Sequence, residues 1–137
     1  MYKSYKFIKA MENKTMEPQT PTQIQQDLLI KAYAAFNARH IDSVLALMHS
    51  DVEWANGMEG GYVRGHAAVR DYWTRQWSLI DPHVEPQGFQ LHESGRIVVH
   101  VHQVVQDLDG NLIHEQMVQH IYTIENGLIR QMDIQVL

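Results

Sequence analysis

The last third of the chain, residues 96–135, alternates apolar and polar side chains in the way that is typical of β-strands. Two turn sequences, Asp109-Gly110-Asn111 and Asn126-Gly127, divide it into three long predicted strands. Asn-Gly is a strong hairpin signal, because a type I′ turn needs positive φ at both central residues. The end of the chain therefore predicts an antiparallel sheet with tight hairpins.

The turn at Asn126-Gly127 also predicts a register. A two-residue loop places Gln119 opposite Ile134 and His120 opposite Asp133, which decides the side chains that share a face. One predicted face carries Met117, Gln119, Ile121, Thr123, Leu128, Met132, Ile134 and Val136, and the other carries Val118, His120, Tyr122, Gln131, Asp133 and Gln135. In the preceding strand, alternation separates Val98, His100, His102 and Val104 from Ile97, Val99, Val101 and Gln103. Both faces are apolar enough to be covered, which predicts helices on one and a second copy of the chain on the other.

Helical spacing of apolar residues dominates the earlier part of the folded chain. Thr22 and Gln25 form a possible capping box at the start of the first helix. A shorter helix is expected around residues 44–48, and a third over residues 65–77. Asp81-Pro82 ends the third helix, because proline disfavours helical backbone at the residue before it.

The remaining segments complete an α+β pattern. Residues 51–55 predict a short strand, residues 56–65 a glycine-rich loop, and residues 83–93 a bulged strand. The order indicates three N-terminal helices packed on a curved, mainly antiparallel sheet. Such a sheet, covered by helices, leaves a concave space in which small molecules commonly bind.

Length and composition fit one domain. The chain has 137 residues, and we expect a folded domain over residues 22–137 after a flexible tail at residues 1–21. The net charge of −5 argues against nucleic acid as a partner. With no cysteine, thiolate catalysis and zinc–sulfur sites are excluded. No secretory signal or apolar run of about 20 residues is present, so a cytoplasmic location and no membrane partner are expected.

Three segments carry a family resemblance: AYAAFNARHIDSVLALMHSDVEW, GYVRGHAAVRDYW and IYTIENGLIRQMDI. In their order, over about residues 24–137, the chain resembles the SnoaL-like branch of the nuclear-transport-factor-2-like (NTF2-like) superfamily, which includes ketosteroid isomerase. The resemblance implies a cone-shaped, cystatin-like α+β fold with a pocket between sheet and helices. It also implies a homodimer formed through the outer face of the sheet.

The resemblance does not extend to the catalytic groups of ketosteroid isomerase. Their positions correspond to Ala32, Asn56 and Gln119 in this chain. Alanine has no hydrogen-bond donor, and an amide does not accept a proton at neutral pH. Isomerisation by that mechanism is therefore not expected.

The resemblance also implies which side chains line the pocket. The helical and loop side is expected to supply Phe36, Trp54, Asn56, Met58, Tyr72, Trp73 and Gln76, and the sheet His102, Val104, Met117, Gln119, Met132 and Ile134. Aromatic and methionine side chains with a few amides suit a flat, mainly apolar ligand. Each apolar member of this set can equally be an ordinary core residue.

His102 is the first candidate for proton transfer, because it is predicted on the pocket face and histidine titrates near neutral pH. The alternative is a buried neutral histidine bonded to a backbone or amide group. His120 and Asp133 are the second candidates, as predicted cross-strand neighbours about 5 Å apart. The predicted register places that pair on the outer face, where an interface ion pair is the simpler interpretation; a one-residue bulge would reverse it.

The spacing His100-Val101-His102 also fits two metal ligands on one strand face, with Glu115 or Gln119 nearby. It lacks a firm third ligand, so neither a metal nor another cofactor is expected. The sequence therefore predicts cofactor-free acid–base catalysis, such as cyclisation, dehydration or isomerisation, on a small apolar oxygenated molecule. The alternative is a non-catalytic ligand-binding or dimerisation module of the same fold.

Overall fold

The structure is a computed structural model that describes residues 20–136. The predicted tail, residues 1–21, lies almost entirely outside this part and stays a prediction. The elements in chain order are α2 (Gln23–Asn37), α3 (Ile41–Leu45), β1 (Met48–Ala55), β2 (Tyr62–Arg64), α4 (Gly65–Leu79), β3 (Asp81–Leu91), β4 (Ile97–Gln106), β5 (Leu112–Glu125) and β6 (Leu128–Val136).

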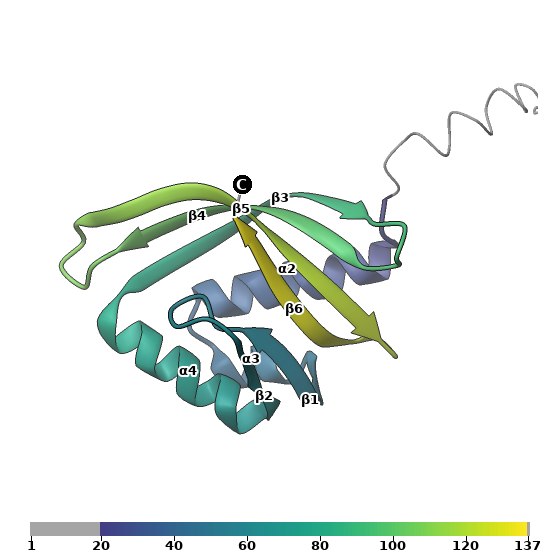
Figure 1. Ribbon diagram of the computed structural model, residues 1–137, viewed down its shortest axis with the longest axis horizontal. Coiled ribbons are helices and arrows are strands. Elements are labelled where there is room, and N and C mark those ends of the chain that lie inside the picture. The colour runs from purple at the N-terminus through teal and green to yellow at the C-terminus, as the bar shows by residue number, and fades with distance from the viewer. Residues whose placement is uncertain (1–19, 137) are drawn as a thin grey trace, which may run out of the picture.

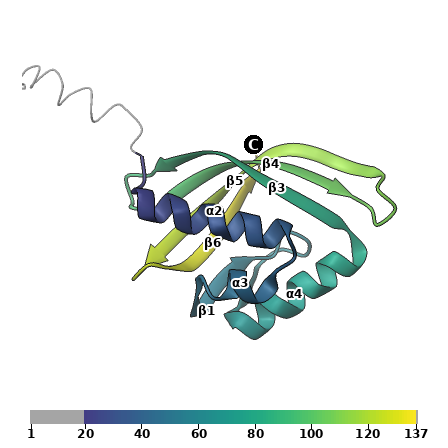
Figure 2. The ribbon, with the colours of Figure 1, turned by 180° about the vertical axis from the view of Figure 1, so that it is seen from behind.

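The strands form one curved six-stranded sheet in the order β2-β1-β6-β5-β4-β3. Neighbours pair antiparallel except β1 and β6, which are parallel. The long strands arch over α2, while α4 lies toward the other end of the concave side (Figures 1 and 2). The α+β class is confirmed, but β1 and β2 precede α4, and α3 has only five residues. The expected layer of three N-terminal helices is therefore not what the described residues form.

Helix α2 begins and ends at side chains that hold it in place. The predicted capping box is confirmed: the Thr22 hydroxyl accepts from the Gln25 N–H at 3.1 Å, and the Gln25 side chain accepts from the Thr22 N–H at 3.0 Å. At the other end, the Asn37 amide donates to the Val84 carbonyl and accepts from the Val84 N–H. This pair of bonds fixes the end of α2 against β3, with the helix facing the concave side of the sheet.

The predicted hairpin at Asn126-Gly127 is confirmed, since both residues have positive φ, 52° and 77°. Beyond the turn the register changes at a bulge: Ile124 pairs with Ile129, but Thr123 pairs with Gln131. Arg130 is the extra residue on β6, at the segment where β6 also pairs with β1.

Because of the bulge, the pairing of β5 with β6 differs by one residue from the predicted pairing. His120 pairs with Ile134, and Asp133 pairs with Ile121. Because side chains alternate along a strand, the shift moves β5, and β4 paired to it, to the opposite face from the one predicted. The concave face therefore carries Ile97, Val99, Val101, Gln103, Val105, Val118, His120 and Tyr122, whereas Val98, His100, His102, Val104, Met117, Gln119, Ile121 and Thr123 lie on the outer face.

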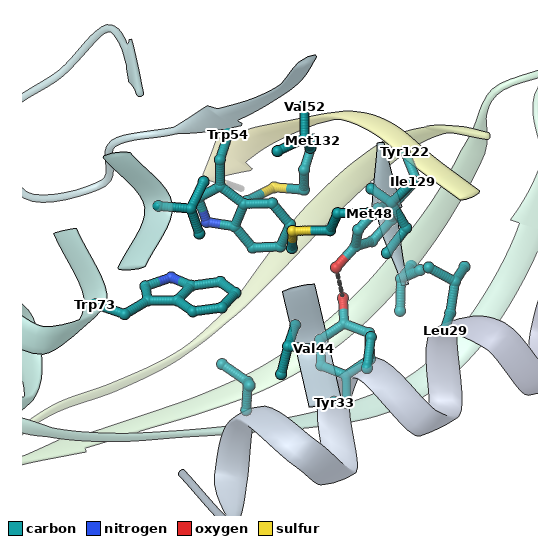
Figure 3. Packing of buried hydrophobic residues seen from close by; sticks show 14 of the residues in the cluster. Leu29, Tyr33, Val44, Met48, Val52, Trp54, Trp73, Tyr122, Ile129 and Met132 are labelled. Atoms are coloured by element: carbon teal, nitrogen blue, oxygen red, sulfur yellow. Dashed lines mark hydrogen bonds between the residues drawn. The ribbon is translucent and has the colours of Figure 1, made fainter. Parts of the chain in front are cut away.

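The core fills the concave side with aromatic, aliphatic and methionine side chains from both helices and sheet (Figure 3). Trp54 and Trp73 pack edge to face with ring centroids 5.3 Å apart. Such a contact adds to the stabilisation from the apolar area that the rings bury. None of the helices in the described part of the chain has the length and apolar character needed to cross a membrane.

Candidate functional site

A cavity of about 250 Å³ lies between the concave face of the sheet and helices α2 and α4. Its walls are mainly aromatic and aliphatic. Eight of the residues predicted to bind substrate line the cavity: Phe36, Trp54, Met58, Tyr72, Trp73, Gln76, Met132 and Ile134. The predicted character of the pocket, apolar walls with few polar groups, is the character that the structure shows.

Four residues predicted to bind substrate do not line the cavity: Asn56, Val104, Met117 and Gln119. The last three lie on the outer face because of the bulge in β6. Asn56 stays beside the cavity, but its carbonyl oxygen accepts from the backbone N–H groups of Met58 and Glu59 at 3.0 and 2.9 Å. Its side chain therefore holds the β1–β2 loop rather than facing a ligand.

The predicted position of His102 is also wrong. Its side chain is 37% exposed on the outer face, where Nε2 lies 2.6 Å from a Glu115 carboxylate oxygen. Asp133 lies on the same face and bonds to Arg96, Tyr62 and Gln131. His102 and Asp133 therefore have no contact with the cavity, and the predicted pair of His120 with Asp133 is separated by the sheet.

His120 is the histidine that the fold places deep in the cavity. It is only 7% exposed, and its Nδ1 lies 2.8 Å from the Tyr33 hydroxyl. The Tyr122 hydroxyl donates to the Tyr33 hydroxyl oxygen at 2.9 Å, a bond drawn in Figure 3. Tyr33 comes from α2 and Tyr122 from β5, so helix and sheet together build a hydrogen-bonded chain of three side chains.

Burial controls the protonation of this chain. It lowers the pKa of His120 to about 4, because a charged imidazolium would lose its hydration there. Burial also raises the pKa values of Tyr33 and Tyr122 well above the ordinary value for tyrosine. At neutral pH all three side chains are therefore uncharged.

The hydrogen-bonded chain allows two arrangements of protons. When the Tyr122 hydroxyl donates to Tyr33, Tyr33 donates to His120 Nδ1 and the ring proton lies on Nε2; the reverse order places the ring proton on Nδ1. Nε2 has no hydrogen-bond partner among residues 20–136, and the ring lines the cavity. In the first arrangement His120 offers a neutral N–H donor to a molecule bound in the cavity, and in the second an acceptor.

Tyr72 adds a second hydroxyl to the cavity wall. Its oxygen accepts from the Gly57 backbone N–H at 3.0 Å, and burial raises the pKa of Tyr72. No Asp or Glu of the described residues lines the cavity, and no group of three or more His, Asp or Glu side chains there has the arrangement of a metal site. The site therefore combines an apolar cavity with neutral hydrogen-bond donors.

Sequence interpretation missed Tyr33, Tyr122, Gln103 and Gln116 as cavity residues. The resemblance does not imply Tyr33, because it places the tyrosine of ketosteroid isomerase at Ala32. Gln103 and Tyr122 belong to the sets that the predicted register places on the outer face, and Gln116 is in neither predicted set. A signal was available in β5, where Val118 and Tyr122 flank His120 at alternate positions and make that set at least as apolar as the other.

Known proteins share both the sequence pattern and the fold of this chain. The model of the SnoaL-like domain family matches residues 29–132. No curated protein matches the chain.

Solved structures share the fold over most of the chain. TerC, co-crystallised with polyporic acid, is similar with 25% identity and a TM-score of 0.73, covering 84% of this chain and 92% of its own. An NTF2-like protein from Burkholderia pseudomallei has 24% identity and a TM-score of 0.73, with 85% and 92% covered. A Mycobacterium tuberculosis protein in complex with estradiol-17beta-hemisuccinate has 18% identity and a TM-score of 0.69, with 81% and 92% covered. The fold is therefore NTF2-like.

Proposed function

The chain belongs to the SnoaL-like domain family, and we propose that it binds a small, mainly apolar, oxygenated molecule in the cavity and performs cofactor-free acid–base chemistry on it. The observation that carries this proposal is the buried Tyr122–Tyr33–His120 chain, which ends at a histidine ring in an apolar cavity; we take the ring proton to lie on Nε2, which has no partner among residues 20–136. The likeness to TerC, which holds polyporic acid, supports a ligand of this class.

His120 is proposed as the catalytic residue in place of His102. With a pKa of about 4 it is a weak base at neutral pH, but its Nε2–H remains a good hydrogen-bond donor. A substrate carbonyl oxygen accepts that bond and gains negative charge as the substrate becomes an enolate. A preorganised donor in an apolar cavity stabilises this charge more than water does.

Tyr33 and Tyr122 act as positioning residues. The Tyr33 hydroxyl holds the ring of His120 and keeps the proton on Nε2, while Tyr122 fixes the direction of the Tyr33 bond. Because no carboxylate of the described residues lines the cavity, the substrate itself must supply an acidic C–H, as a 1,3-dicarbonyl compound does. Solvent at the open side of the cavity takes the C–H proton. In cyclisation the enolate carbon then attacks a second carbonyl carbon of the substrate, whose oxygen takes up a proton; in dehydration the enolate re-forms the carbonyl and a C=C bond as the β-hydroxyl leaves as hydroxide, which takes up a proton to give water.

Ligand binding without turnover is the second candidate function. The absence of an Asp or Glu from the described cavity wall favours it, because the usual strong general base is missing there. Hydrogen-bond donors and apolar walls are sufficient to bind a ketone or a phenol. Measurement of turnover separates the two functions.

Replacement of His120 by phenylalanine tests the proposal. Ketones and polycyclic phenols are first screened for a rise in the unfolding temperature of the wild-type protein, and the hits are assayed for turnover. We expect the variant to bind carbonyl ligands about three- to tenfold more weakly, because one neutral hydrogen bond is lost. Where turnover occurs, removal of an oxyanion donor should lower kcat by about 10²- to 10³-fold.

His102→Phe is the matched control, since His102 lies on the outer face and contacts Glu115. This variant should keep wild-type binding and kcat. Equal behaviour of the two variants would contradict a role for His120, whereas binding with no turnover of any hit would leave the binding module as the function.

We also propose a homodimer formed through the outer face of the sheet. Half-exposed apolar side chains gather there, namely Val98, Val104, Met117 and Ile121, and Met117 is 42% exposed. Exposed apolar side chains on the face of a sheet are typical of an interface, and twofold symmetry would set the same face of two copies together.

Met117→Lys tests the dimer, because two lysines would meet near a symmetric interface and their charges would lose hydration. We expect sedimentation equilibrium to show a dimer for the wild type and a shift of at least tenfold toward monomer for the variant. Leu108→Lys, in the exposed β4–β5 turn, is the control and should stay dimeric. A monomeric wild type at high micromolar concentration would refute this interface.

A further inference from the structure

The cavity wall also carries a pair of amides that the chemistry at His120 does not use. Gln103 of β4 and Gln116 of β5 are cross-strand partners on the concave face, and both line the cavity. The Gln116 amide N–H donates to the Gln103 carbonyl oxygen at 3.0 Å. Both side chains are half-buried, so the pair forms part of the wall rather than of the solvated surface.

This amide pair keeps hydrogen-bonding capacity for a ligand. A single bond between two amides uses one N–H and one oxygen, which leaves the Gln103 Nε2 donors and the Gln116 Oε1 acceptor. Neither group has another partner among the described residues. A donor and an acceptor side by side match a hydroxyl group, which accepts one bond and donates the other.

The spacing along β5 separates this pair from His120. Gln116 and His120 lie on the same face four residues apart, which corresponds to about 13 Å between their Cα atoms. Val118 stands between them and is buried, and Ile134 of β6 pairs with His120. Along β5 the cavity wall thus runs from the polar ring of His120, past a buried apolar side chain, to the polar amide pair.

We propose that Gln103 and Gln116 form a second recognition subsite, which binds a hydroxyl group at the far end of the ligand whose carbonyl meets His120. The pocket then selects elongated, rigid molecules of two or three rings with oxygens at both ends. This inference rests on the proposed function of the same cavity and adds the class of ligand. A ligand with a single oxygen would cover the amide pair without forming hydrogen bonds to it. The amides would then lose hydration with no new bond to compensate, and apolar side chains would serve such a ligand better.

A pair of matched ligands tests the subsite. 4-Acetyl-4′-hydroxybiphenyl carries a ketone and a distal hydroxyl, and 4-acetylbiphenyl lacks only the hydroxyl. Calorimetric titration of the wild type should give about three- to tenfold tighter binding of the hydroxylated ketone. The double variant Gln103→Met, Gln116→Met keeps the side-chain length and should lose this preference while still binding 4-acetylbiphenyl.

Gln119→Met is the control variant, on the same strand but on the outer face, and should keep the wild-type preference. Both ligands are measured on every variant, so a folding defect would weaken both equally and leave their ratio unchanged. Equal affinity of the two ligands for the wild type, with His120→Phe still weakening both, would overturn the subsite and leave the proposed function standing. Failure of both ketones to bind the wild type would overturn the proposed function and this inference with it.

Discussion

Replacement of Trp73 by alanine is expected to lower the free energy of unfolding by about 3–5 kcal/mol, the range for deletion of a fully buried aromatic side chain. Trp73 is 1% exposed and packs against Trp54, Phe36 and Trp77, with ring centroids 5.3–5.9 Å apart. The loss combines the apolar area returned to water with the cavity left among these rings. Urea unfolding followed by circular dichroism measures it.

Leu79→Ala is the control on the same helix, because Leu79 is exposed at the end of α4. It should change the free energy of unfolding by less than about 0.5 kcal/mol. A Trp73→Ala variant as stable as the control would mean that the rings close over the vacant space, and the packing account of the core would be wrong.

Acidification from pH 6.5 to about 4 is expected to lower the free energy of unfolding by about 3 kcal/mol through His120 alone. The folded protein holds this imidazole at a pKa of about 4, whereas an unfolded histidine titrates near 6.5. Well above pH 6.5 neither the folded nor the unfolded state binds the proton, so the neutral His120 does not lower the free energy of unfolding there. As the pH falls from 6.5 to about 4, the unfolded chain binds a proton that the folded protein does not, and stability decreases through this window.

His120→Gln isolates this contribution, because the Gln amide oxygen still accepts from the Tyr33 hydroxyl but does not titrate. The difference in unfolding free energy between the wild type and this variant should shrink or reverse as the pH falls from 6.5 to 4. The control variant His102→Gln leaves His120 and its bond to Tyr33 intact. Its free energy of unfolding should decrease with acid as that of the wild type does. A difference independent of pH would show that the folded protein accepts the proton on His120 as readily as the unfolded chain does.

Local signals in the sequence predicted the elements well. The Thr22 capping box, the proline after α4, the bulged strand around Pro86 and the turn at Asn126-Gly127 all act through residues close in the chain. Alternation and helical spacing then gave an α+β fold with a cavity, and the family resemblance supplied eight of the lining residues. The caps, turns and bulge depend on short-range backbone preferences, which a sequence records directly. The lining residues came from the resemblance.

The sequence by itself determined the type and order of most elements, the capping box and the hairpin turn, because each depends on neighbouring residues. The tertiary structure decided which histidine enters the pocket. One extra residue, Arg130, bulges from β6 where this strand pairs with both β1 and β5, and the shift turns His120 inward and His102 outward. Side chains alternate with a period of two, so a displacement of one residue exchanges the faces, and only contacts between distant strands fix that displacement.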